Sequence, residues 1–319
     1  MDTLLQIKNL NVKFSLIDTS ILAVRDVSFE IKEGETLGLV GESGCGKSVT
    51  AFSILKLISP PGKIESGEII YRGKNILEFS EEKIRRIRGK EIAIIFQEPM
   101  TSLNPVFKIG FQVSETIRLH LKKNKKDAKE KTIELLKVVG IPNPGKRYNS
   151  YPHELSGGMR QRVMIAIALS ASPSILIADE PTTALDVTIQ AQILDLLLNI
   201  QENEKMSLLL ISHDLGVVAN VADKIAIMYA GEIVEFGTVK EIFNNPLHPY
   251  TIGLFEAIPQ IGDDRARLKT IPGVVPTISD VPKSCVFSPR CLKSDNSCLN
   301  RNIPFVEKGK DHLAKCIKL

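Results

Sequence analysis

Apolar residues follow two patterns along the chain, which together predict alternating strands and helices. Near-alternating apolar positions at 4–14 and 24–31 predict short strands. Four later segments are short and continuously apolar, as is typical of buried strands in a parallel sheet. These segments are residues 36–40, 92–96, 174–178 and 208–212. Helical patterns lie between them, for example at 158–170 and 189–201, so the alternation predicts an α/β core.

Breaks in these patterns indicate how the chain is divided. Residues 98–162 contain no apolar strand pattern and are expected to form an inserted helical subdomain. A helix that begins near Lys47 should run towards Leu57, because Pro60-Pro61-Gly62 ends it. After Phe236-Gly237 prolines become frequent and periodicity fades. We therefore expect a large domain at 1–258 and a small irregular domain at 259–319.

Composition narrows the class of protein. The 319 residues are 43% hydrophobic and 24% charged, which is ordinary for a globular chain. The net charge of +4 is too small to indicate nucleic acid, and the basic segment 122–126 is interpreted as a solvated helix face. No apolar stretch approaches the ~20 residues that span a bilayer, and the first residues lack a signal-peptide layout. A cytoplasmic chain is expected, with other chains supplying any membrane part.

The segment 41–48 fits the phosphate-loop pattern G-x-x-x-x-G-K-[ST], with a predicted strand before it and a predicted helix after it. Glycines let the backbone curl so that its N–H groups face phosphate oxygens, and the helix adds its positive N-terminal end. Lys47 is expected to bridge the β- and γ-phosphates of ATP, and Ser48 to hold Mg²⁺. The candidate nucleotide-binding residues are Gly41, Ser43, Gly44, Cys45, Gly46, Lys47 and Ser48. Cys45 either serves packing alone or is a reactive thiol beside Lys47.

Two adjacent carboxylates follow the apolar segment 174–178, at the strand end where open α/β sheets bind ligands. Asp179 is expected to support Mg²⁺, directly or through water. Glu180 is expected to polarise the attacking water as a general base.

Further motifs lie between the phosphate loop and Asp179-Glu180, and after them. Leu155-Ser156-Gly157-Gly158-Met159 begins a predicted helix about 110 residues after Lys47, with a serine N-cap that leaves N–H groups for an anion. Thr183-Ala184-Leu185-Asp186 and Ser212-His213-Asp214 follow. Together with the phosphate loop and Asp179-Glu180, this set resembles the nucleotide-binding domain of ABC ATPases over roughly residues 4–240. The resemblance implies a P-loop NTPase core with an N-terminal antiparallel β-subdomain, an inserted helical subdomain and a small irregular C-terminal domain.

The resemblance also implies roles for single residues. Gln97 looks like the Q-loop glutamine that senses Mg²⁺ and the γ-phosphate. Ser156, Gly157 and Gly158 look like the signature motif, which contacts ATP held by the opposite subunit. Asp186 looks like the D-loop residue, and His213 looks like the switch histidine near the γ-phosphate. Phe14 is expected to stack on adenine or, alternatively, to be a core phenylalanine.

A narrower branch of the family is indicated by Met159 and by the segments 97–105, 228–235, 248–251 and 272–276. These resemble the dipeptide, oligopeptide and nickel importers. The resemblance implies import of peptides, with nickel as the alternative. It also implies a second homologous ATPase subunit that is usually a different polypeptide, two permease subunits and an extracytoplasmic solute-binding protein. The chain would then lie peripherally at the cytoplasmic face of the cell membrane.

Four of the five cysteines lie near the C-terminal end: Cys285, Cys291, Cys298 and Cys316. Four thiolates suit either tetrahedral Zn²⁺ or an iron–sulfur cluster, and the spacing alone leaves the metal open. Resemblance to the peptide-importer branch implies a [4Fe–4S] cluster with a structural role, a redox-sensing role being the alternative. His312 is either a ligand, a neighbour of one, or a surface histidine.

The sequence disfavours three other functions. Chromosome-maintenance ATPases with this signature insert a long coiled coil, which the heptad-free segment after Lys47 does not provide. Soluble translation-factor ATPases carry two ATPase domains, whereas this chain has one phosphate loop. A metal-binding regulator with an inactive ATPase is disfavoured, because Glu180 and His213 are both present.

Overall fold

The computed structural model describes residues 2–15, 19–97, 102–183, 185–257, 270–276, 281–282, 284–299, 303–309 and 311–319. Contacts divide the chain into two units. The first unit comprises Met1–Leu4, Ile31–Thr36 and Glu78–Ile211. The second comprises Leu5–Glu30, Leu37–Leu77 and Ser212–Leu319.

The first unit contains the three parallel strands β6 (Ile92–Ile95), β7 (Ile175–Asp179) and β8 (Ser207–Ser212). β7 lies between the other two and pairs in parallel with both. Every residue of β7 and β8 is buried, which explains their unbroken apolar sequence.

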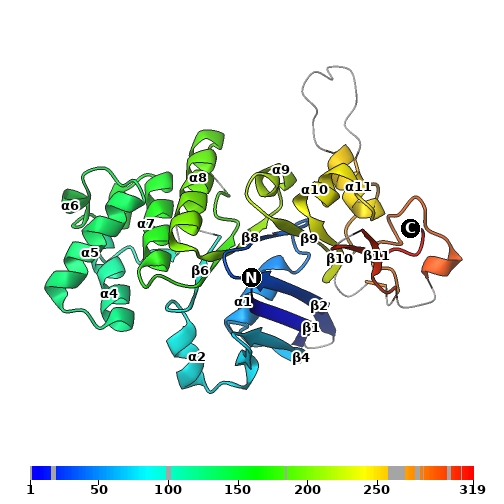
Figure 1. The fold of residues 1–319 in the computed structure, drawn as a ribbon, viewed down its shortest axis with the longest axis horizontal. Coiled ribbons are helices and arrows are strands. Elements are labelled where there is room, and N and C mark those ends of the chain that lie inside the picture. Colours follow the sequence, from blue (N-terminus) through cyan, green and yellow to red (C-terminus); the bar gives the residue numbers. More distant parts are fainter. Residues whose placement is uncertain are drawn as a thin grey trace. The chain divides into compact units, whose positions relative to one another are not determined.

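Helices supply the rest of this unit. They are α2 (Glu81–Ile87), α4 (Ile109–Leu121), α5 (Lys125–Val138), α6 (Pro144–Arg147), α7 (Gly157–Leu169) and α8 (Val187–Glu204). α4 and α5 pack against each other and both contact α7, and the group is plain in Figure 1. Asn124 begins α5 because its side chain accepts hydrogen bonds from the N–H groups of Lys126 and Asp127.

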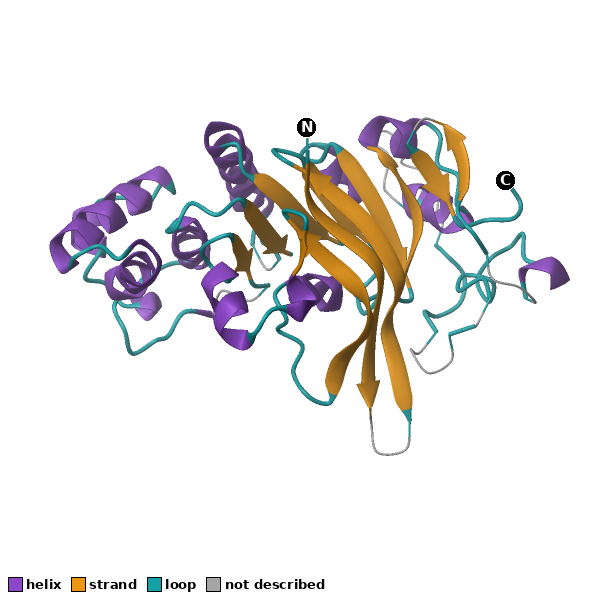
Figure 2. Ribbon diagram, turned by 60° about the horizontal axis from the view of Figure 1, so that its bottom comes forward, coloured by secondary structure: helices purple, strands orange, loops and turns teal. Residues whose placement is uncertain are grey.

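The second unit contains an antiparallel sheet of β1 (Thr3–Ser15), β2 (Ser20–Lys32), β4 (Gly62–Tyr71) and β5 (Lys74–Asn75). The order is β2-β1-β4-β5, so the first strand of the chain is interior (Figures 1 and 2). This sheet confirms the predicted N-terminal antiparallel β-subdomain. The short η1 helix (Ile76–Glu78) follows it.

A second group of strands in this unit includes the last residues of the chain. β3 (Thr36–Val40) pairs in parallel with β9 (Lys224–Tyr229), and β10 (Glu232–Thr238) turns back along β9. β12 (His312–Ala314) then pairs with β10, and β11 (Val306–Gly309) pairs with β12. The helices of the unit are α1 (Lys47–Ile54), α9 (Leu215–Ala219), α10 (Val239–Asn244), α11 (Pro249–Glu256) and η3 (Asn296–Cys298).

The predicted buried strands and the helical character of the inserted segment are confirmed within the described ranges. The first predicted helix is shorter than expected: it ends at Ile54, and Lys56 adopts a left-handed conformation with φ 51°. The expected domain boundary at 258/259 and the start of the helical subdomain at residue 98 lie outside the described residues. Within the described ranges, no helix combines the length and apolarity that a membrane crossing needs.

Candidate functional site

The phosphate loop joins β3 to α1, and its glycines are required by close backbone approaches. A Cβ on Gly41 would stand 2.1 Å from the Met228 carbonyl oxygen. At Gly46, φ is 104° and a Cβ would stand 2.5 Å from the Ala23 carbonyl oxygen. Any larger residue at either position would have to displace main chain.

Lys47 lies inside this loop at the start of α1. Its ammonium donates to the carbonyl oxygens of Gly41 at 2.8 Å and Glu42 at 3.0 Å, and the residue is 5% exposed. Ser43 and Gly44 are exposed, and Ser48 is partly exposed on the first turn of the helix. The loop therefore presents exposed backbone next to a fixed cation, which suits an anionic ligand.

Cys45 is buried in the loop with 1% of its surface exposed. Burial raises the pKa of its thiol, although the charge of Lys47 acts in the opposite direction. A raised pKa lowers the thiolate fraction at neutral pH, which favours the packing role over the reactive one.

The carboxylate of Glu180 lies in a second group of polar residues, at the end of β7. One oxygen, Oε2, accepts a hydrogen bond from Gln97 Nε2 at 2.9 Å and another from Thr183 Oγ1 at 2.9 Å. Glu180 itself has φ 46°, and its N–H donates to the Ile211 carbonyl at 3.0 Å. Asp179, immediately before it, is 1% exposed. A non-glycine residue in the left-handed region is uncommon and is often found at functional sites.

Sequence reasoning named Gln97 and Glu180 separately, and the structure brings them together. Thr183 was quoted as part of a motif but was given no role. A hydroxyl three residues after the candidate carboxylate is the signal that would have indicated it.

The signature segment forms the start of α7. Ser156 is its N-cap and accepts a hydrogen bond from the Met159 N–H at 3.3 Å. Gly157 is exposed, whereas a Cβ on Gly158 would stand 2.9 Å from Ile189 Cγ2. Asp186 caps the neighbouring helix α8 by accepting from the Ile189 N–H at 2.9 Å.

Two further candidates lie in the second unit. His213 is exposed just after β8, and Asp214 caps the short helix that follows. Phe14 is partly buried near the end of β1, where its ring covers Gly62: a Cβ there would stand 2.6 Å from Phe14 Cε1. Because Asp179, Glu180 and Gln97 belong to the other unit, a common nucleotide site for all of these residues stays a prediction.

The four late cysteines line one small cavity of about 10 Å³ and are free thiols. Burial raises the pKa of Cys285 to about 11 and also raises the pKa of Cys291. Among the residues that the structure describes, no group of three or more His, Cys, Asp or Glu side chains is placed to hold a metal ion. Neither the cluster nor the zinc alternative is therefore shown.

His312 is neither a surface residue nor directed at the cysteines. It is 1% exposed, and its Nε2 lies 2.8 Å from Oε1 of the fully buried Glu235. The expectation that it is a surface histidine was wrong, because β12 carries it into contact with β10.

Comparison with family models gives two matches. A model described as ABC transporter matches residues 24–183. A model described as oligopeptide/dipeptide transporter, C-terminal region, matches residues 234–298.

Relatives are similar over nearly the whole chain. The oligopeptide transport ATP-binding protein OppD of Bacillus subtilis is 50% identical, covering 98% of this chain and 88% of the relative. A putative peptide import ATP-binding protein of Brucella melitensis is 49% identical, and the match covers 99% of this chain and 97% of the relative. The dipeptide transport ATP-binding protein DppD of Escherichia coli is 48% identical, covering 92% and 90%.

Solved structures agree with these matches. The ATP-binding cassette MJ0796, in a dimeric post-hydrolysis state bound to ADP and Pi, superposes with a TM-score of 0.67 at 27% identity. That alignment covers 74% of this chain and 98% of the other. The cbiO1 protein of Clostridium perfringens, part of the transporter complex cbiONQ, gives a TM-score of 0.66 at 28% identity and covers 77% and 92%.

Proposed function

The chain belongs to the ABC transporter family of ATPases, and on that premise we propose that it powers the import of di- and oligopeptides through partner permease subunits. The peptide class is supported by the match of residues 234–298 to the oligopeptide/dipeptide C-terminal region and by relatives named for peptide transport. Nickel import by the same motor is the alternative.

Hydrolysis is assigned to Glu180, and its placement is the observation that carries the proposal. Its carboxylate is held by Gln97 and Thr183 at the carboxyl end of a buried parallel strand. A carboxylate fixed in this way can accept the proton of a water that attacks the γ-phosphate. Lys47 would pair with the phosphate charge, and His213 would lie near the γ-phosphate.

Mg²⁺ is the metal that ATP hydrolysis of this kind requires, and oxygen donors suit it. Ser48 supplies a hydroxyl, Asp179 a carboxylate and Gln97 an amide oxygen. The ion would neutralise charge that develops on the phosphates.

A second homologous subunit completes the site in this proposal. The exposed N-terminus of α7, with Ser156 and Gly157, would meet ATP bound by the partner. Asp186, at the start of α8, would signal across that contact. The dimeric structure of MJ0796 supports pairing, and a heterodimer is proposed for this chain.

Permease docking is assigned to the apolar surface that follows Gln97. Val106, Phe107 and Phe111 are 70%, 46% and 43% exposed, and the two phenylalanine rings lie 5.1 Å apart. Exposed apolar residues that cluster on a surface fit a protein interface. A peripheral position at the cytoplasmic face of the membrane and delivery of peptide by a solute-binding protein belong to the same proposal, which the relatives named for peptide transport support.

A [4Fe–4S] cluster held by the four late cysteines is also proposed. All four cysteines line one small cavity, so four thiolate donors of the kind that hold such clusters lie in one place. Iron and acid-labile sulfide would be measured in anaerobically purified protein. Stoichiometric amounts, lost in Cys291→Ser but kept in Cys45→Ser, would support the cluster; zinc alone, or no metal, would exclude it.

The decisive experiment for the motor compares the wild type with Glu180→Gln, each co-expressed with the neighbouring ATPase and permease chains. We expect ATP hydrolysis to fall by about 10² or more, in line with loss of a general base, while ATP stabilises association of the two ATPase chains. Turnover at the wild-type rate, with the partner's own catalytic glutamate disabled, would remove Glu180 from its role. Failure of any permease to associate would favour a soluble ATPase.

A further inference from the structure

The guanidinium of Arg290 forms a partly buried ion pair with Glu42, the first variable residue of the phosphate loop. Arg290 Nη1 lies 2.8 Å from Glu42 Oε2, and Nη2 lies 3.4 Å from Glu42 Oε1. The arginine side chain is 5% exposed and the glutamate side chain 28%. A two-pronged arginine–carboxylate contact of this kind fixes geometry as well as charge.

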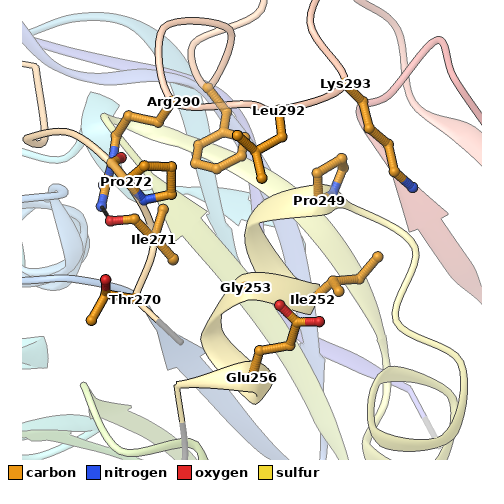
Figure 3. A pocket seen from close by; sticks show the side chains of 11 residues that line it. Pro249, Ile252, Gly253, Glu256, Thr270, Ile271, Pro272, Arg290, Leu292 and Lys293 are labelled. Atoms are coloured by element: carbon orange, nitrogen blue, oxygen red, sulfur yellow. Dashed lines mark hydrogen bonds between the residues drawn. The ribbon is translucent and has the colours of Figure 1, made fainter. Parts of the chain in front are cut away.

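Arg290 is itself held rigidly. Its Nε donates to the Pro272 carbonyl at 3.0 Å and its Nη2 to the Ile271 carbonyl at 3.4 Å. These groups border a cavity of about 370 Å³, where Figure 3 shows the guanidinium beside Pro272 and Ile271. The arginine therefore has little freedom to leave the carboxylate.

The main chain of Glu42 is hydrogen-bonded to Lys47, the cation of the phosphate loop. Its carbonyl oxygen accepts from Lys47 Nζ at 3.0 Å, and its N–H donates to the hydroxyl of the fully buried Tyr250 at 3.1 Å. A shift of Glu42 would therefore move a group that holds the lysine. Its carboxylate also brings a negative charge to the proposed phosphate-binding loop, where it would repel the like charge of a phosphate.

We propose that Arg290 is a positioning residue for the nucleotide reaction, which neutralises and anchors Glu42 so that the phosphate loop accepts ATP. Arg290 immediately precedes Cys291, so the same contact links the cysteine segment to the nucleotide site. The inference rests on the loop being the nucleotide site and is independent of the transported solute.

The test measures the Kd for ATP on the full chain for Arg290→Met, Glu42→Gln and the double variant. We expect Arg290→Met to raise the Kd by about tenfold or more, since it leaves the carboxylate without its buried partner. The double variant should recover most of that loss, because the unpaired charge is gone. Arg290→Lys, which keeps the charge but not the two-pronged contact, should lie between Arg290→Met and the wild type.

Lys315→Met is the matched control, because Lys315 also joins the C-terminal segment to β10, through an ion pair with Glu232 at 3.0 Å that includes no residue of the phosphate loop. It should leave the Kd unchanged. Wild-type affinity in Arg290→Met, or a double variant as weak as Arg290→Met, would overturn the proposal. If Arg290→Met does not fold, an unchanged Kd in Arg290→Lys overturns it. Wild-type affinity in Lys47→Ala would instead remove the nucleotide site itself.

Discussion

The carboxylate of Glu180 depends on Thr183 for part of its placement, because the Thr183 hydroxyl donates to Oε2 at 2.9 Å. Thr183→Val keeps the shape of the side chain and removes this hydrogen bond, worth about 1 kcal/mol. We expect kcat to fall about fivefold with little change in KM, since the bond orients the base and does not bind ATP. Steady-state ATPase kinetics measure both. Thr182→Val, one residue earlier, is the control that leaves the bond intact; equal losses in both variants would contradict this role.

Cys45 provides a pH prediction at the same scale. Burial raises the pKa of its thiol, and only the thiolate reacts with alkylating reagents. Below the raised pKa the thiolate fraction is small, so alkylation at pH 7.5 should be slower than for a free cysteine and should increase as the pH rises. Mass spectrometry of the peptide containing Cys45, with and without denaturant, measures this. Equally rapid labelling of folded and unfolded protein at pH 7.5 would show that the thiol is accessible and reactive.

At the scale of elements, the two adjacent glycines at the start of α7 have different roles: Gly158 packs against α8, whereas Gly157 is exposed and available for binding. A Cβ on Gly158 meets Ile189 Cγ2 at 2.9 Å, whereas a Cβ on Gly157 meets nothing closer than Leu185 at 3.9 Å. Gly158→Val should therefore lower the free energy of unfolding by about 1–3 kcal/mol, because α7 must move from α8.

Gly157→Val should remain within about 1 kcal/mol of the wild type and yet weaken ATP-dependent pairing, because it covers exposed N–H groups of the helix start. Denaturant unfolding and ATP-dependent sedimentation measure the two effects. The same change in stability for both variants would mean that the contact with α8 is not what distinguishes them.

The elements that sequence patterns predicted are those whose burial is continuous. β7 and β8 are buried along their whole length, so their sequences are unbroken apolar segments. β4 was missed because most of its ten residues are exposed or only partly buried, and Gly67 adopts φ 109° within it. Its place in the sheet comes from pairing with β1, and single-sequence patterns carry no such partner information.

The residues of the candidate site likewise fall into those that the sequence predicted and those that it missed. Glu180 was predicted because it follows an apolar strand, and Gln97 through the resemblance to ABC ATPases. Thr183 and Arg290 were missed, since their importance comes from contacts with a carboxylate three or 248 residues away. Such contacts depend on the completed fold, and in the case of Arg290 on a segment with little regular structure.

At the scale of the whole molecule, a strand near the C-terminal end of the chain joins the sheet of the second unit. This strand, β12, pairs with β10, and β10 pairs with β9. β12 pairs with β10 through Glu235 and Ala314, although 79 positions separate them in sequence. His312 is placed on this strand so that its ring reaches Glu235, which is 0% exposed. The C-terminal segment is thereby attached through a buried polar contact and not only through apolar packing.

His312→Ala should therefore loosen this attachment at a measurable cost. Glu235 would keep its hydrogen bonds from the N–H groups of Leu247 and His248, both at 2.8 Å, but would lose its side-chain partner. We expect the free energy of unfolding to fall by about 3 kcal/mol, as when one partner of a buried pair is removed. Lys13→Met breaks the more exposed pair with Glu65, whose side chains are 30% and 41% exposed, and should cost less than about 1 kcal/mol. Urea unfolding of both variants gives the comparison. Equal midpoints would mean that β12 is held by its main-chain pairing alone.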